Sequence, residues 1–214
     1  MVIIMKLVSR LFIFISLVFF INACNSEKDY PSEIIPDITE FNFTDFSLTE
    51  GVTYFEERSF PMNIENSEGE YISNDGHFFN TILEFDSKMK SSLSETLLFN
   101  LNSTYSSNGF FGGCLPMSCA SYYAYLKDET TFILDNKADF LSFIGEVNTL
   151  ANLQLFLRIN SYRGLFYKKV NDDYEVVASK FSCTHAIKQL LQISKHGDIT
   201  VLEMIENKST GTDC

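Results

Sequence analysis

The chain has 214 residues, with 28 acidic against 16 basic side chains and a formal net charge of −12 at pH 7. Hydrophobic residues make up 45% of it, which is enough to fold. This composition excludes a collagen, a coiled coil, a polytopic membrane protein and a disordered tail. The acidic balance also argues against nucleic acid as a partner, because phosphate contacts need clustered lysine and arginine.

The chain opens with the pattern of an export signal. Lys6 and Arg10 supply a positive start, residues 11–21 are apolar apart from one serine, and the small Ala23 precedes Cys24. Such a pattern is typical of a cleaved secretory signal. Cleavage after Ala23 would leave 191 of the 214 residues and, because Lys6 and Arg10 are lost, shift the net charge from −12 to −14. That length suits one hydrophobic core.

The sequence Ile21-Asn22-Ala23-Cys24 resembles the lipobox of bacterial lipoproteins. In that family the cysteine thiol is diacylglycerylated, the signal is cut before it, and the new amine is acylated. The resemblance implies that Cys24 is the lipid attachment site, bears palmitate-type acyl chains and holds the mature chain at the membrane. The alternative is an uncleaved transmembrane anchor, but an apolar run of 11 residues is short of the roughly 20 that a span needs.

The residues after Cys24 give information on the localisation of the protein. In enteric bacteria, an aspartate directly after the lipobox cysteine resembles an inner-membrane retention mark. This chain has Asn25 at that position. Ser26 to Asp29 resembles the short acidic run that serves as a surface-export mark in Bacteroidetes-type lipoproteins, and the alternative is an ordinary solvated tether. We therefore expect an anchor in the outer membrane, on its periplasmic face or on the cell surface.

Residues 24–40 are predicted to form a tether, and residues 41–214 a single domain. The tether holds Pro31, Pro36 and several acids but few large apolar side chains. From Phe41 onward the pattern becomes apolar and periodic, as in a folded domain.

The first part of the domain predicts a hairpin, a short helix and a strand. Runs 71–73 and 78–85 flank Asn74-Asp75-Gly76, a turn sequence that favours a hairpin. Residues 86–94 are polar with two apolar residues four apart, which predicts a short helix. Leu97, Phe99 and Leu101 alternate with their neighbours within 96–102, and this period of two predicts a strand.

The second part predicts strands around a pair of helices. Asn136 is a candidate helix N-cap, and apolar residues recur at i, i+3, i+4 and i+7 from Phe140. The predicted elements are strands 121–126 and 130–134, a helix from Asn136 to about Gly145, a second helix over 149–159, and two hairpins that pair 165–170 with 174–180 and 186–194 with 199–205.

This order indicates an α+β fold, an antiparallel β-sheet built from hairpins with a helix pair packed on one face. The stretch from Gly113 through SYYAYL, the helix pair and FYKKV resembles small lipoproteins of flavobacterial type. The resemblance covers about the second half of the chain and implies no activity.

Four cysteines follow Cys24, and disulfides are the default outside the cytoplasm. If the last hairpin turns at 196–197, Cys183 lies opposite residue 210, and a flexible tail can bring Cys214 to it. The prediction is therefore Cys183–Cys214 at the base of the hairpin and Cys114–Cys119 around a small loop. One alternative is a metal site of Cys114, Cys119 and Cys183, with His185 or Cys214 as fourth ligand. Another is a reactive thiol in Cys114-Leu-Pro-Met-Ser-Cys119.

The sequence holds none of the common catalytic motifs, and we expect no catalytic, metal or cofactor site. His77, His185 and His196 are expected to be exposed or structural. The acid pairs 56–57 and 172–173 are expected to be solvated charge. The glycine-flanked Phe110 and Phe111 lie in a predicted loop, where they could form an exposed contact or plug the core.

These observations favour a lipid-anchored cell-envelope protein that acts as a non-enzymatic binding or structural module. The expected partners are the membrane, through the N-terminal lipid, and a protein, but not nucleic acid. One alternative is an inhibitor or immunity-type protein, whose negative charge would steer it to a basic partner. The other is an envelope hydrolase, which predicts a pocket where two of His77, His185 and a carboxylate converge.

Overall fold

The computed structural model describes residues 29–65, 67–74, 76–111, 119–181 and 184–211. The chain divides into Met1–Tyr30 and a compact unit from Pro31 to Cys214, and the description below concerns the second. Over the described ranges, no helix combines the length and apolar character that a membrane crossing requires.

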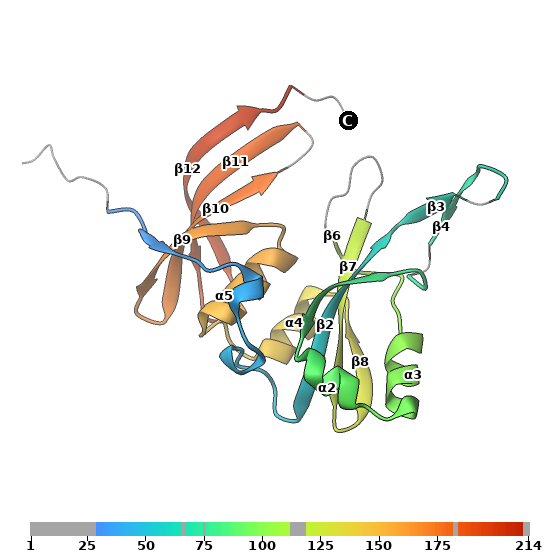
Figure 1. Ribbon diagram of the computed structural model, residues 1–214. Coiled ribbons are helices and arrows are strands. Elements are labelled where there is room, and N and C mark those ends of the chain that lie inside the picture. The colour runs from blue at the N-terminus through green and yellow to red at the C-terminus, as the bar shows by residue number, and fades with distance from the viewer. Residues whose placement is uncertain (1–28, 66, 75, 112–118, 182–183, 212–214) are drawn as a thin grey trace, which may run out of the picture. The chain divides into compact units, whose positions relative to one another are not determined.

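One five-stranded antiparallel sheet is built mainly from the C-terminal hairpins (Figure 1), in the order β1-β9-β10-β11-β12. Its long strands follow one another along the chain because tight turns join them, with Asn171 and Gly197 in positive-φ conformations. The strands are β1 (Glu33–Ile34), β9 (Arg163–Val170), β10 (Asp173–Phe181), β11 (His185–Ile193) and β12 (Ile199–Ser209).

The other five-stranded sheet has the path β5-β2-β7-β6, with β8 also paired to β7. A two-stranded ribbon of β3 and β4 extends from the same part of the chain. The strands are β2 (Val52–Pro61), β3 (Asn63–Glu65), β4 (Tyr71–Ser73), β5 (Asn80–Phe85), β6 (Phe110–Phe111), β7 (Cys119–Lys127) and β8 (Thr130–Leu134).

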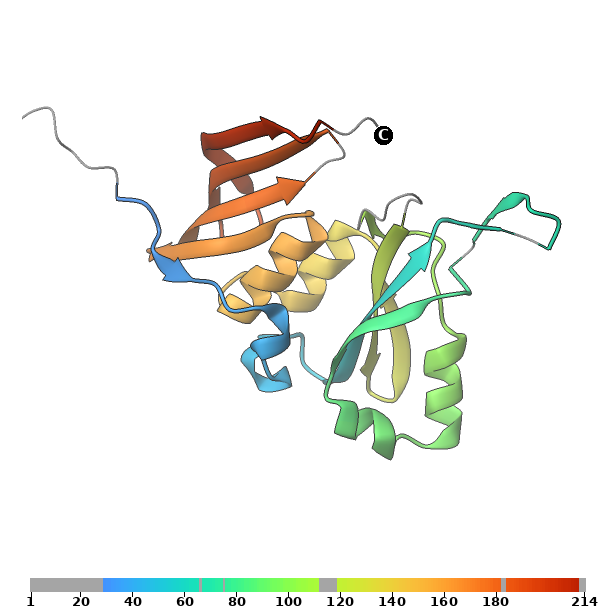
Figure 2. The same ribbon diagram turned by 45° about the horizontal axis from the view of Figure 1, so that its top comes forward.

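The helices begin at polar caps and bury apolar faces. The Asn136 side chain accepts from the backbone N–H of Asp139, and the Thr149 side chain accepts from that of Asn152. Figures 1 and 2 show α4 and α5 side by side against strands β9–β12. The helical segments are the 3₁₀ turns η1 (Ile38–Glu40) and η2 (Phe43–Asp45), then α2 (Ser87–Ser92), α3 (Glu95–Ser103), α4 (Lys137–Ile144) and α5 (Leu150–Ile159).

One hydrophobic cluster joins both large sheets and the helix pair. It includes Phe55 of β2 and Tyr123 of β7, Phe156 of α5, and Val176 and Leu191 of the C-terminal sheet. The α+β class, the antiparallel pairing and the packed helix pair are therefore as predicted, although the strands form two large sheets rather than one. Residues from both halves of the domain share a core.

The predicted tether is wrong in its C-terminal part. Ile34 pairs with Phe166 of β9, and Ile35 and Ile38 are buried in the main cluster. Asp37 and Glu40 form a capping box around η1. The folded unit therefore begins near Pro31, not at residue 41.

Two further predictions in the first part are wrong. β4 pairs with β3, and β5 pairs with β2, so residues 71–85 do not form a hairpin. Residues 95–103 are helical rather than extended, because Ser94 caps the helix by accepting from the backbone N–H of Leu97. Leu101 is the buried residue of this helix, whereas Phe99 is 70% exposed, so the alternation did not mark a sheet face.

The short helix predicted within 86–94 is confirmed as α2, and the predicted strands and helices of the second part are confirmed as β7 to β12, α4 and α5. The predicted loop before Cys114 contains the two-residue strand β6, in which Phe110 pairs with Ser121.

Candidate functional site

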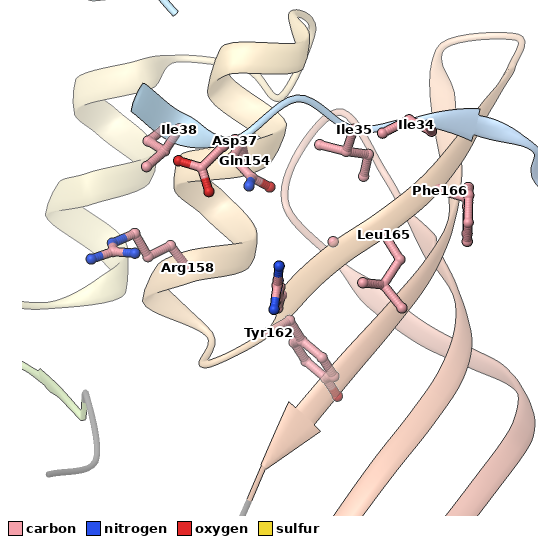
Figure 3. A pocket seen from close by; sticks show the side chains of 11 residues that line it. Ile34, Ile35, Asp37, Ile38, Gln154, Arg158, Tyr162, Leu165 and Phe166 are labelled. Carbon is pink, nitrogen blue, oxygen red and sulfur yellow. The ribbon is translucent and has the colours of Figure 1, made fainter. Parts of the chain in front are cut away.

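A surface pocket of about 440 Å³ lies beside α5. Residues 34–38 cross one side of it, α5 forms another, and the start of β9 forms the third (Figure 3). The lining residues are Ile34, Ile35, Asp37, Ile38, Gln154, Arg158, Tyr162, Arg163, Gly164, Leu165 and Phe166. The pocket thus combines an apolar wall with acidic, basic and amide groups, as ligand sites commonly do.

The segment 34–38 is fixed to the rest of the domain by backbone bonds and buried side chains. The backbone N–H of Ile35 donates to the carbonyl oxygen of Leu165 at 3.2 Å, next to the β1–β9 pairing. Asp37 accepts from the backbone N–H of Thr39 at 3.0 Å, and its own N–H donates to Glu40 Oε1 at 2.8 Å. The capping box therefore sets the position of the Asp37 carboxylate at the pocket.

Gly164 allows the close approach of the three walls. A Cβ placed there would lie 2.7 Å from Ile35 Cδ1 and 2.8 Å from Leu157 Cδ1, closer than carbon atoms can pack. The same Cβ would lie 3.3 Å from Gln154 Oε1. A side chain at this position would require the terminal methyl groups of Ile35 and Leu157 to shift, so the glycine lets these two side chains pack closely at the pocket.

The two arginines of the pocket have different partners. Arg158 Nε donates to Glu57 Oε2 at 2.5 Å, and this ion pair links α5 to β2. Arg163 is exposed at the first position of β9. Hydrogen bonds from Thr39 lower the pKa of Asp37, and the charges of Arg158 and Arg163 lower it further. Asp37 is therefore an anion at neutral pH.

Gln154 lines the pocket, but its amide oxygen is itself buried. Its Oε1 is buried and has no hydrogen-bond partner. Figure 3 shows its amide group between Asp37 and the start of β9. A buried acceptor without a donor carries a desolvation penalty, and most such groups in proteins are satisfied.

A second polar cluster lies on β2 and its neighbours but is internally satisfied. We call Tyr54, Glu56, Arg58, Glu84 and Lys90 the Glu56 cluster. Glu56 accepts from Arg58 Nε at 2.6 Å, from Lys90 Nζ at 2.7 Å and from Tyr54 Oη at 2.5 Å. The guanidinium also donates to carbonyl oxygens at the end of α3, those of Leu101 at 2.9 Å and Thr104 at 2.6 Å. This arrangement fastens α2 and α3 to the sheet.

The expectation of solvated charge is wrong for the acid pair 56–57. Glu56 and Glu57 are 0% and 2% exposed, and their partners are Arg58 and Arg158 respectively. Adjacent residues of a strand point to opposite faces, so each carboxylate meets a different arginine. For the pair 172–173, Asp172 is exposed, as expected.

Phe110 belongs to the core, which excludes it as an exposed contact. It is 7% exposed, and its ring centroid lies 6.2 Å from that of Tyr123 and 5.9 Å from that of Phe140. The open question of a contact loop or a core plug is thus decided for Phe110 in favour of the core. Phe111 pairs with Ala120 through the backbone.

Four of the five cysteines lie outside the described residues: Cys24, Cys114, Cys183 and Cys214. The predictions that rest on them therefore stay predictions. Cys119 begins β7 and is disulfide-bonded, and its pairing stays a prediction. The backbone N–H of Thr210 donates to the carbonyl oxygen of Thr184 at 2.9 Å, and His185 pairs with Ser209, so the register at this end of the hairpin differs by one residue from the one on which Cys183–Cys214 was based. Within the described ranges, no three histidine, cysteine or acidic side chains are placed to hold a metal ion.

The histidines do not contribute to the pocket. The His77 ring lies against Phe78 and Tyr105, with centroid distances of 5.4 Å and 5.0 Å. His185 and His196 are exposed, and no histidine lines the pocket beside α5.

The pocket itself was not predicted. The signals that could have indicated it are the Asp37-x-x-Glu40 capping sequence and the isoleucines around it.

Comparisons with known proteins add no relative: no family model, curated protein or solved structure matches the chain.

Proposed function

We propose that the chain is a lipid-anchored protein of the cell envelope that acts as a non-enzymatic binding module, with the pocket beside α5 as its binding site. The observation that carries the binding proposal is a pocket of about 440 Å³ in which the charged side chains of Asp37 and Arg163 lie beside an apolar wall. The anchor rests on the lipobox resemblance at Cys24. The outer membrane, on its periplasmic face or on the cell surface, is the proposed location.

The contrast between the two polar regions supports binding at this pocket. In the Glu56 cluster, the carboxylate of Glu56 accepts hydrogen bonds from three donors of the same chain, so these hydrogen bonds stabilise the fold. In the pocket, the charged side chains of Asp37 and Arg163 are exposed beside buried isoleucines. An apolar wall with a few polar groups is the usual lining of a small-molecule site.

The lipid anchor is tested by growing cells with an alkyne analogue of palmitate and comparing the wild-type chain with Cys24→Ser. We expect the wild type to incorporate the label and to sediment with membranes, and the variant to lose the label. Label on the Cys24→Ser variant at the wild-type level would show that the lipid is elsewhere. Proteinase treatment of intact cells would then separate the two faces of the outer membrane.

The binding site is tested by calorimetric screening of small acids, amines, zwitterions and neutral compounds against the full chain in detergent. We expect at least one compound to bind the wild type and to lose affinity in Arg163→Gln. Lys169→Gln is the matched control, because it removes a cation from an exposed position on the same strand outside the pocket lining. Equal binding to both variants would place the ligand elsewhere, and a screen without any binder would contradict the proposal.

A further inference from the structure

We propose that two copies of the chain form a two-fold dimer in which their β12 strands pair antiparallel along the outer edge. The two five-stranded C-terminal sheets would then form one continuous sheet. This surface is separate from the pocket beside α5, since no residue of β12 lines that pocket. A long open strand edge, exposed apolar side chains along it and a local balance of charge point to this dimer.

The outer edge of β12 is open to a further strand. β12 has 11 residues and lies at the end of the strand order of its sheet (Figure 1). Within the described ranges, β11 is the only strand that pairs with it. A strand edge of this length presents a row of backbone donors and acceptors to an extended chain that reaches it.

β12 has little of the protection that sheet edges commonly have. Natural edges are shortened, interrupted by proline or bent by bulges. The opposite edge of this sheet, β1, is only two residues long. β12 contains no proline, and its two register shifts against β11 increase its twist without shortening the edge. The sheet thus has one edge that is too short for stable pairing and one that is long enough.

Exposed apolar side chains cluster on β12. Val201, Leu202 and Met204 are between 46% and 48% exposed and Ile205 is 36% exposed, all within five consecutive positions. Contiguous apolar surface of this kind marks a contact. A lipid surface is a poor partner, because the hydrocarbon of a bilayer does not accommodate the open edge of a sheet. A second strand extends the backbone hydrogen bonding and covers these side chains, so the partner is an extended polypeptide.

The distribution of charge favours a second copy of the same chain as this polypeptide. Residues 31–162 hold 19 acidic and 6 basic side chains, whereas residues 163–211 hold 6 acidic and 7 basic ones. The net negative charge of the folded unit therefore lies outside the segment that forms β9 to β12. Two copies that approach through their acidic parts repel each other, but two copies that meet through β12 bring nearly neutral segments together.

Self-pairing of β12 gives a closed assembly. When the same edge of both copies pairs antiparallel, a two-fold axis relates the copies and each β12 edge is used once. Pairing of β12 with β1 of another copy would instead leave a free edge at each end and continue into a filament. The two residues of β1 offer too few backbone hydrogen bonds for that contact. The edges of this sheet therefore favour a dimer over a longer assembly.

Sedimentation velocity of the full chain in detergent, over a range of protein concentrations, measures the assembly. We expect a reversible equilibrium between monomer and dimer without larger species. Hydrogen–deuterium exchange of the wild type at a monomeric and at a dimeric concentration then locates the contact. Exchange should be slower in residues 199–209 of the dimer and the same at both concentrations in α3, because only β12 gains backbone hydrogen bonds.

Met204→Lys tests the edge directly, because Met204 is the middle residue of β12 and 48% exposed. The new charge enters the two-fold contact once from each copy, so the dissociation constant of the dimer should rise at least about tenfold. Phe99→Lys is the matched control, since it places a lysine at an apolar position that is 70% exposed on α3. It should leave the dissociation constant unchanged, and both variants should keep the unfolding midpoint of the wild type.

A monomer at every concentration would overturn the proposal. So would a dimer whose dissociation constant is the same in Met204→Lys, or one whose formation does not slow exchange in β12, because each of these results places the contact on another surface. Assemblies that keep growing with concentration would overturn the two-fold closure. The exchange measurement uses the wild type, so it decides the case even if Met204→Lys lowers the unfolding midpoint.

Discussion

The ion pair between Glu57 and Arg158 should respond very differently to the loss of each partner. The Glu57 side chain is 3% exposed and that of Arg158 is 41% exposed, and their contact distance is 2.5 Å. Replacing Arg158 with glutamine leaves a buried carboxylate without its cation. Replacing Glu57 with glutamine leaves a guanidinium that water can reach.

The exposures set the expected magnitudes. Removing one partner so that a buried charge is left uncompensated costs about 3–5 kcal/mol, and Arg158→Gln should reach this range. In Glu57→Gln the amide oxygen can still accept from Arg158 Nε, so the loss should be about 1 kcal/mol, that of a weakened hydrogen bond. The difference of at least about 2 kcal/mol corresponds to roughly thirtyfold in the unfolding equilibrium.

Urea unfolding followed by circular dichroism measures both variants against the wild type, with the slope of the transition checked for constancy. Arg163→Gln is the control, because this arginine is exposed at the same pocket, and it should change stability by less than about 0.5 kcal/mol. Equal losses for the two variants, or a larger loss in Glu57→Gln, would refute the reasoning from burial.

Three further changes test the fold by the same unfolding assay. Phe110→Ala should cost about 3–5 kcal/mol because it empties a core position, and a loss below about 1 kcal/mol would contradict its place in the core. Gly164→Ala should cost about 1–3 kcal/mol by overpacking, since the new Cβ would lie 2.7 Å from Ile35 Cδ1, and an unchanged midpoint would refute the tight approach. Burial alone would raise the pKa of Glu56, but the charge of Arg58 and the other donors lower it below 4.5. The stability that Glu56 contributes is thus present above pH 4.5 and lost as the pH falls further, so Glu56→Gln should flatten the loss measured between pH 5 and pH 3. An unchanged pH profile in Glu56→Gln would contradict this assignment.

The second half of the domain could be predicted because its signals are local. Turn residues at 171–173 and 195–198 connect adjacent strands, and polar caps at Asn136 and Thr149 begin helices with regular apolar stripes. Each signal lies within the element it specifies, so the sequence pattern and the structure agree.

The missed elements depend on distant residues. The C-terminal carbonyl groups of α3 accept hydrogen bonds from Arg58, more than 40 positions away, and a period of two in residues 96–102 carries no sign of that contact. β4 precedes the turn sequence at residues 74–76, but it pairs with β3 before it in the chain, and β5 pairs with β2. Tertiary contacts thus override the local pattern.

The candidate site could not be predicted from local sequence patterns for the same reason. Its walls come from residues 34–38 and from residues 154–166, which only the fold brings together. Asp37 and Glu40 could be recognised as a capping box, but the apolar residues beside them were too few to indicate a buried segment. The role of Gly164 follows from the closeness of Ile35 and Leu157, which no sequence window contains.

Hydrogen–deuterium exchange of the full chain, with and without a compound that the calorimetric screen finds to bind, tests the proposed binding site most directly. We expect slower exchange in two separate segments, residues 33–40 and residues 154–166, and the same exchange as without ligand in α2 and α3. Loss of this protection in Arg163→Gln would tie it to the pocket. Protection that spares both segments, or that persists unchanged in the variant, would contradict the assignment of the pocket.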